Sequence, residues 1–248
     1  SSTACTSGSM SIGRGYEAIR FGMQDIMVVG GGEELCPSEA TVFDTLFATS
    51  VMNDTPEKSP RPFDKSRDGL VIGEGAGTLI LEELEHAQSR GASIYAEVVG
   101  YGTTTDGRHA TQPTEETMAE ALRLSLESAG LSADAIGYVN AHGTATELGD
   151  IAETQATQKI LGQSMPISSL KSYIGHTLGA CGALEAWMSI KMMSENWFAP
   201  TLNLDDVDER CGALDYITNG VRDLSCDFIM SNNFAFGGVN TSLIFKRL

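Results

Sequence analysis

The chain has 248 residues, of which 42% are hydrophobic and 20% charged, and 16 basic against 33 acidic side chains give a formal net charge of −17. This is the composition of a soluble globular protein with one large or two modest domains, and it excludes a disordered chain or a small disulfide scaffold. Because phosphates are bound by basic surfaces, the acidic balance argues against a nucleic-acid partner and disfavours an anionic membrane surface.

The first part of the chain is predicted to contain a helix followed by strands. Hydrophobic periodicity predicts a helix over residues 7–22 and a buried strand over 25–29, which ends in three consecutive glycines. Residues 52–69, with three prolines and many charges, form the longest predicted loop. Alternating small and apolar residues over 70–81 favour a strand.

The second part of the chain continues the alternation. Strands are predicted at 94–100, 138–139, 228–232 and 240–246, and helices at 115–130, 150–161 and 178–194. The pattern is typical of an α/β fold. A charged helix that ends near residues 90–92 predicts a boundary between a first unit, 1–91, and a second unit, 92–248.

The sequence contains neither a predicted membrane-spanning or secretion segment nor the cysteine spacing of a zinc site. No run approaches the roughly 20 apolar residues that cross a bilayer, and no secretion signal is present. We therefore expect no membrane association and a cytoplasmic location. None of the five cysteines stands in a C-x-x-C pair, which argues against a zinc site and a disulfide framework (Cys5, Cys36, Cys181, Cys211, Cys226).

Three side chains are candidates for nucleophilic and acid–base chemistry. Cys5 lies among small residues at the start of the first helix, where unpaired N–H groups and the helix dipole favour a thiolate. His142 follows a strand, where α/β sheets hold ligands, and His176 enters a helix five residues after Lys171. Taken singly, each of these residues is more simply explained as a structural cysteine or histidine. Together they form a candidate nucleophile with two imidazoles.

The order of these segments resembles that of the elongating β-ketoacyl-acyl carrier protein synthases. The matching segments are Thr3-Ala4-Cys5, Arg61-Pro62-Phe63-Asp64 with Arg67-Asp68-Gly69, His142-Gly143-Thr144, Lys171 to His176, and Asn233-Phe234-Ala235-Phe236-Gly237-Gly238. The family comprises condensing enzymes of fatty acid and polyketide synthesis with a layered, thiolase-like αβαβα fold. The run from Gly30 to Cys36 is similar to the synthase I branch and the run from Gly73 to Gly77 to synthase II, so the subtype stays open.

The resemblance implies a decarboxylative Claisen condensation. Cys5 would take an acyl group from a carrier-protein thioester, and His142 and His176 would polarise malonyl-acyl carrier protein and assist its decarboxylation. Lys171 would support His176 electrostatically, and the backbone N–H groups of Cys5 and Phe236 would form the oxyanion hole.

Further residues acquire roles through the same resemblance. Thr144 and Thr146 match positions that bind the phosphopantetheine arm, while Phe43 and Phe236 match aromatics that gate the acyl channel. Asp150 and Glu153 match acidic positions that support the catalytic groups. A structural monovalent cation, not required for the reaction, is implied near four oxygen-bearing side chains (Asn140, Glu185, Ser231, Asn232).

The family also implies the partners. We expect an acyl carrier protein and a homodimer, with no permanently bound cofactor and with substrates carried on the phosphopantetheine of the carrier. Because acyl carrier proteins are acidic, docking needs a local basic patch, for which Arg61, Lys65 and Arg67 are candidates in the long loop.

Two functional alternatives remain open, besides a domain whose histidines and cysteines are all structural. One is a thiolase-superfamily enzyme that uses coenzyme A thioesters, although such starter enzymes pair one histidine with an asparagine. The other is a non-catalytic partner of the chain-length-factor type, although such partners usually lack the nucleophile that Cys5 supplies. Family members carry a long segment upstream of the nucleophile, so we expect this chain to be the C-terminal part of such a protein and to be inactive alone.

Overall fold

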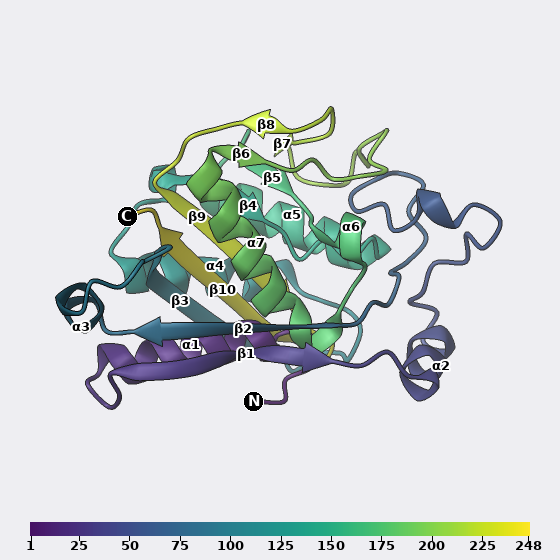
Figure 1. The fold of residues 1–248 in the computed structure, drawn as a ribbon. Coiled ribbons are helices and arrows are strands. Elements are labelled where there is room, and N and C mark those ends of the chain that lie inside the picture. The colour runs from purple at the N-terminus through teal and green to yellow at the C-terminus, as the bar shows by residue number, and fades with distance from the viewer.

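The computed structural model describes residues 1–248 and is built around a mixed six-stranded sheet in the order β3-β10-β9-β4-β5-β7 (Figure 1). The first three of these strands are antiparallel neighbours, and β9, β4, β5 and β7 run parallel. Their bounds are β3 (Glu97–Thr105), β4 (Ile136–Asn140), β5 (Pro166–Ser168), β7 (Asp215–Tyr216), β9 (Phe228–Phe234) and β10 (Val239–Lys246).

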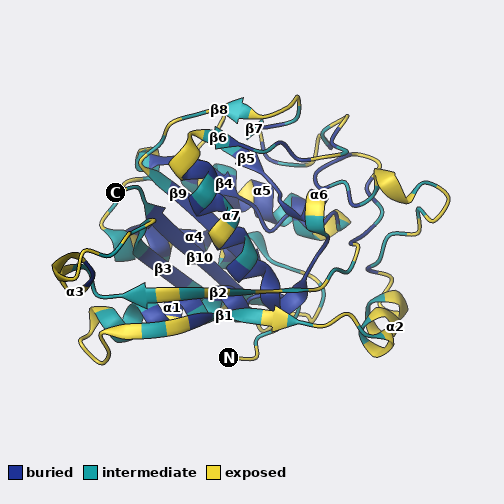
Figure 2. Ribbon diagram, in the orientation of Figure 1, coloured by how far each residue is buried: buried dark blue, intermediate teal, exposed yellow.

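Helices cover both faces of this sheet. One face carries α4 (Glu115–Ala129) and α5 (Glu147–Leu161), and the other carries α1 (Ser7–Arg20) and α7 (Cys181–Glu195). Each face of the sheet packs against its helices in a separate hydrophobic core. Successive strand residues therefore belong to different cores: Ile229 packs with α1 and α7, and Met230 packs with α4 and α5. The sheet is therefore buried on both sides, as Figure 2 shows by its dark central strands β9 and β10.

A second, two-stranded antiparallel sheet packs against the other side of α1 and α7. Its strands are β1 (Ile26–Glu33) and β2 (Gly75–Glu82). Their inward residues contact the helices, whereas Val28 and Ile80 on the outer face are 69% and 61% exposed. Helices and sheets thus alternate in layers, as the predicted α/β class requires.

Glycines allow α1 and α7 to cross at close range. A Cβ on Gly182 would lie 2.6 Å from the backbone nitrogen of Ser9, and one on Gly8 would lie 2.9 Å from the nitrogen of Ala183. Three glycines make α1 a poor helix by propensity alone. Packing against α7 and the two sheets stabilises it instead.

Several boundaries differ from the predictions. The strand predicted to end before the glycine run continues to Glu33, because a Cβ on Gly31 would lie only 2.2 Å from the carbonyl oxygen of Gly179 and glycine alone permits this approach. The strand predicted from residue 70 begins at Gly75. The helix predicted from 178 opens with the 3₁₀ turn η3 (Leu178–Ala180) before α7.

Short elements complete the chain, and several of them were not predicted. They are α2 (Pro37–Thr45), α3 (Leu84–Ser89), α6 (Lys171–Ile174), the 3₁₀ turns η1 (Pro56–Lys58) and η2 (Ala133–Ala135), and the paired strands β6 (Trp197–Phe198) and β8 (Arg222–Asp223). No helix in the structure is both long and apolar enough to cross a membrane.

Candidate active site

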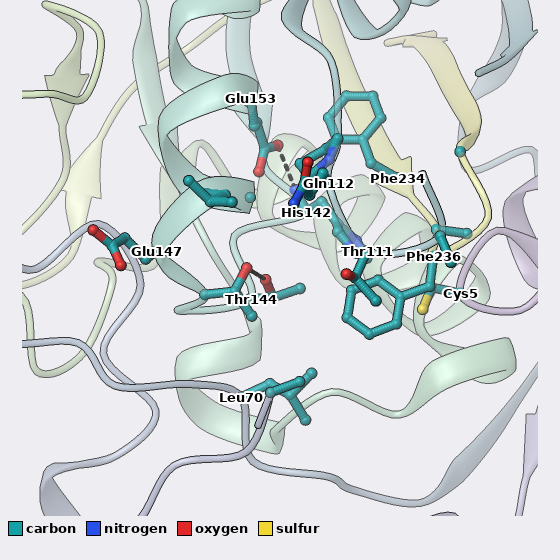
Figure 3. A pocket seen from close by; sticks show the side chains of 18 of the residues that line it. Cys5, Leu70, Thr111, Gln112, His142, Thr144, Glu147, Glu153, Phe234 and Phe236 are labelled. Carbon is teal, nitrogen blue, oxygen red and sulfur yellow. Dashed lines mark hydrogen bonds between the residues drawn. The ribbon is translucent and has the colours of Figure 1, made fainter. Parts of the chain in front are cut away.

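The candidate residues from both ends of the chain converge on one cavity of about 300 Å³. Its lining combines Cys5, both predicted histidines, the segments 106–118 and 144–149, and Phe234 and Phe236 from the end of β9 and the turn after it (Figure 3). Thr144, Thr146 and Phe43 also line it, and the rings of Phe43 and Phe236 lie 5.7 Å apart between centroids. The predicted nucleophile, imidazoles, hydroxyls and aromatics therefore share one space.

Cys5 sits in a tight elbow just before α1. The preceding Ala4 has a left-handed φ of 49°, and the Cys5 side chain is buried. Burial raises the pKa of the Cys5 thiol to about 11, although Lys171 and the backbone N–H groups of Phe236 and Cys5 oppose this shift. Burial thus acts against the thiolate that the start of the helix would favour. The same two N–H groups point at the space beside the sulfur.

His176 is the direct partner of the nucleophile. Its Nε2 lies 3.0 Å from Cys5 Sγ, and its Nδ1 accepts a hydrogen bond of 3.2 Å from the backbone N–H of Leu178. A neutral imidazole that accepts at Nδ1 carries its proton on Nε2. His176 therefore presents an N–H donor to the cavity.

His142 is arranged in the same way. Its Nδ1 lies 3.2 Å from Lys171 Nζ and 3.4 Å from Asn233 Nδ2, both of which are donors. The two imidazole centroids are 5.0 Å apart with an interplanar angle of 87°. Burial, and after it the charge of Lys171, holds the pKa of both His142 and His176 well below the usual range. Both rings are neutral and offer Nε2–H to the same region.

Lys171 is paired behind the imidazoles. Its ammonium group contacts His142 directly rather than His176, and it forms a buried ion pair with Glu185. Glu185 also accepts a hydrogen bond of 2.7 Å from Asn233 Nδ2. Asn233 belongs to the motif that carried the family resemblance, but the sequence contained no signal that it bridges Glu185 to His142.

Two buried carboxylates hold the loop after β4. Glu153 accepts the backbone N–H groups of His142 and Gly143 at 2.6 and 2.7 Å, and Asp150 accepts those of Phe63 and Ala145 at 2.7 and 3.2 Å. Burial raises the pKa of Glu153 to about 8 and that of Asp150 to about 6, against the opposing effect of these bonds and, at Asp150, of a nearby arginine.

The three central groups also have the spacing of a metal site. One ligand atom each from Cys5, His142 and His176 lies within 4.8 Å of the others. A metal-bound histidine normally donates its second N–H to an acceptor. Here both Nδ1 atoms face donors instead, so the Nε2 lone pairs are not available. The trio is suited to donating hydrogen bonds and not to ligating a metal.

Further buried polar side chains lie on the adjacent strands β4 and β9, some of them next to Glu185. The side-chain oxygens Asn140 Oδ1 and Asn232 Oδ1 are buried without a hydrogen-bond partner, and Asn140 Nδ2 donates to Ser231 Oγ at 3.3 Å. Glu185 lies beside Asn140. Asn140, Ser231 and Glu185 offer oxygen donors of the kind that bind hard cations. The Asn232 side chain lies on the opposite face of β9, which packs against α4, so the four side chains do not surround one site.

One set of predicted residues is placed differently. The Arg67 side chain is only 1% exposed, and Arg61 is 11% exposed and paired with Asp64 and Asp205, each at 3.0 Å. Neither matches the expectation of a basic docking patch, because buried or paired arginines present little free charge. Lys65 is the one exposed candidate of the three.

Comparisons with known proteins agree on the family. The family models "Beta-ketoacyl synthase, N-terminal domain" and "Beta-ketoacyl synthase, C-terminal domain" match residues 1–87 and 95–205. The 3-oxoacyl-[acyl-carrier-protein] synthase 2 of Vibrio cholerae is 44% identical, and synthase 1 of Escherichia coli is 42% identical; the alignments cover 100% of this chain and 61% and 60% of those proteins. The chain thus spans about 60% of the length of the curated relatives it matches.

Solved structures show the same likeness. A β-ketoacyl synthase from Burkholderia phymatum matches with a TM-score of 0.99 and 62% identity, over 100% of this chain and 60% of that one. The ishigamide ketosynthase/chain length factor matches with a TM-score of 0.94 and 36% identity, again over 100% and 60%. The layered, thiolase-like fold is therefore confirmed, and the chain belongs to the β-ketoacyl synthase family.

Proposed function

We propose that the protein carrying this chain is a 3-oxoacyl-[acyl-carrier-protein] synthase, an acyltransferase that elongates an acyl chain in fatty acid or related polyketide synthesis. The observation that carries the proposal is the convergence on Cys5 of two neutral imidazoles, both of which direct Nε2–H into the cavity. A nucleophilic thiol beside two fixed donors suits a reaction in which a thioester carbonyl develops negative charge.

The first half-reaction loads the enzyme. Cys5 attacks the carbonyl of an acyl thioester, the new C–S bond replaces the bond to the carrier sulfur, and the thiol proton leaves with the carrier. The backbone N–H groups of Cys5 and Phe236 stabilise the oxyanion of the tetrahedral intermediate. Their orientation toward the sulfur supports this role.

The second half-reaction forms the carbon–carbon bond. Malonyl thioester loses CO₂, and the electron pair stays on an enolate whose oxygen accepts from the Nε2–H groups of His142 and His176. The enolate carbon attacks the acyl carbonyl on Cys5, the C–S bond breaks, and Cys5 regains a proton from solvent. The product is a β-ketoacyl thioester two carbons longer. Burial keeps the imidazoles neutral, and Lys171 adds to this effect because its charge disfavours a second cation beside them.

The remaining assignments follow from position in the cavity. Thr144 and Thr146, whose hydroxyls lie 2.9 Å apart, would bind the phosphopantetheine arm, and Phe43 and Phe236 would gate the acyl channel. Asp150 and Glu153 would hold the loop between them. Asn140, Glu185 and Ser231, which share the α7 face of the sheet, would hold a structural monovalent cation, and no permanently bound cofactor is proposed.

The partners belong to the same proposal. The relatives' names specify acyl carrier protein, and we infer it as the partner here, together with a homodimer and a cytoplasmic location. The division into units 1–91 and 92–248 is proposed as well. A chain-length-factor-type partner and a coenzyme A-using enzyme remain the competing functions.

Mass spectrometry tests the proposal. The natural protein is incubated with acyl-carrier protein and malonyl-carrier protein, and the acylated Cys5 peptide and the β-keto product are followed together. Both should disappear in Cys5→Ala and persist in Cys36→Ala, which removes a thiol outside the cavity. Absence of acylation with every chain length would favour the non-catalytic partner. Acylation without extension would contradict the roles given to His142 and His176, and acylation only from coenzyme A thioesters would favour the other alternative.

A further inference from the structure

Arg67 is a buried cation for which the proposed mechanism has no use. It lies at the end of the long loop 52–69, and its side chain is 1% exposed. A buried charge is costly unless its partners are arranged around it. Its surroundings therefore indicate what it holds in place.

The guanidinium group joins three segments that are far apart in sequence. Nη1 donates to Asp208 Oδ2 at 2.7 Å and to the carbonyl oxygen of Asp64 at 2.8 Å. Nη2 donates to the carbonyl of Glu147 at 2.9 Å, and Nε donates to that of Thr146 at 3.3 Å. This use of the planar fork is available to arginine and not to lysine.

The stability of α5 alone does not explain why an arginine stands at position 67. Thr146 is the N-cap of α5, so Arg67 places a positive charge beside the positive end of the helix dipole. Asp150 compensates at 3.4 Å from Nε. A helix needing only stability would be better served by an acidic group there.

The loop that Arg67 contacts is strained. Gly143 and Ala145 have φ values of 37° and 64°, and left-handed backbone at alanine persists only where the surroundings hold it. Glu153 holds the beginning of the loop through two backbone N–H groups. Arg67 holds its end through the carbonyl of Thr146, whose hydroxyl meets that of Thr144 at 2.9 Å.

We infer that Arg67 is a positioning residue, which fixes the Thr144 and Thr146 hydroxyls for the amide-bearing arm of the thioester substrate. The inference rests on the proposed function, because that function supplies the arm. Arg67 lines the cavity, but its guanidinium nitrogens donate to Asp208 and to three backbone carbonyls, so we assign it to positioning and not to contact with the reacting atoms. Its loss should weaken binding of the arm and leave the chemistry at Cys5 in place.

The test compares a substrate that has the arm with one that lacks it. Arg67→Lys keeps the positive charge and removes the planar guanidinium group. KM and kcat of this variant are measured with malonyl-carrier protein and with the S-ethyl thioester of malonate. We expect KM for the carrier-bound substrate to rise by about tenfold with kcat within about twofold, and kcat/KM for the armless thioester to stay within about twofold. Arg210→Lys is the matched control, because Arg210 also pairs with Asp208, at 2.7 Å, but has a half-exposed side chain.

The possible outcomes separate the two ideas. If the unmodified protein condenses neither substrate, the proposed function fails. If it condenses both and Arg67→Lys impairs them equally, or impairs neither, the inference is refuted while the function stands. If Arg67→Lys does not fold, Asp208→Asn weakens the same anchor and should raise KM by about threefold for the carrier-bound substrate alone. An unchanged KM in that variant would equally refute the inference.

Discussion

Replacing Gly182 by alanine tests whether the crossing of α1 and α7 sets the geometry of the site. An exposed helical glycine gains about 1 kcal/mol when it becomes alanine. At Gly182 the new Cβ would lie 2.6 Å from Ser9 N, 2.8 Å from Ser9 Cβ and 2.7 Å from Asn233 Oδ1. Ser9 N and Ser9 Cβ cannot move without the backbone of α1, and Asn233 is held by the bond from its Nδ2 to Glu185, so the helices must separate. Overpacking of this kind costs about 1–3 kcal/mol.

The upper end of that range applies, because three contacts fall below 3.0 Å at once. Subtracting the propensity gain leaves a net loss of about 2 kcal/mol, which corresponds to a fall in Tm of about 4–8 °C for a domain of this size. Thermal unfolding measures it, with Ser194→Ala on the exposed face of α7 as the control that should gain slightly. Gly182→Ala should also slow alkylation of Cys5, since α1 carries the thiol away from His176. A Tm equal to or above that of the unmodified protein would refute the overpacking argument.

Further predictions concern the charges of the site. Because the pKa of His142 and His176 lies well below 6.5, the rings stay neutral as the pH falls through 6.5; kcat/KM should show no histidine inflection there, and a measured inflection at 6.5 would contradict the assignment. The unfolded chain binds protons at these rings first, so their contribution to stability is complete above pH 6.5 and declines below it, as urea unfolding across pH can test. Lys171→Met leaves the buried carboxylate of Glu185 without its cation and should lower the free energy of unfolding by about 3–5 kcal/mol. The double variant with Glu185→Leu should regain part of this loss. If it regains none, the ion pair does not contribute as described. Glu153→Gln turns an amide toward one of two backbone N–H groups and should cost about 1–3 kcal/mol in the same assay, and a neutral result would mean that the loop does not depend on this acceptor.

Much of the fold could be predicted from local patterns. The amphipathic α4, for example, carries an apolar periodicity that tertiary contacts only reinforce. The failures occur where the local pattern and the packing disagree. The glycines of β1 look like a turn in sequence, but they lie in the strand because the backbone of Gly179 comes within contact distance.

The membership of the candidate site could be predicted, but its electrostatics could not. Local motifs single out Cys5, His142 and His176 as candidates. No pattern in the sequence shows that the three side chains lie next to one another in the fold. The burial that raises the pKa of Cys5, and the donors that face each imidazole Nδ1, come from residues more than a hundred positions away or on other elements. Arg67 looked like a surface charge because a loop rich in charges predicts exposure.

The close crossing of α1 and α7 fixes the distance between Cys5 and His176 independently of the residues that form the cavity walls. Cys5 precedes the start of α1 by two residues, and His176 precedes the turn that leads into α7 by two residues. The distance between sulfur and imidazole is therefore set where two glycine-bearing helices touch, deep inside the molecule. The cavity walls, in contrast, come partly from the end of α2 with the residues that follow it, as far as Ala48, and from the loop 106–114. We expect these segments to tolerate changes in length and side chain more readily than the helix crossing does, so the cavity wall can change without moving Cys5 relative to His176.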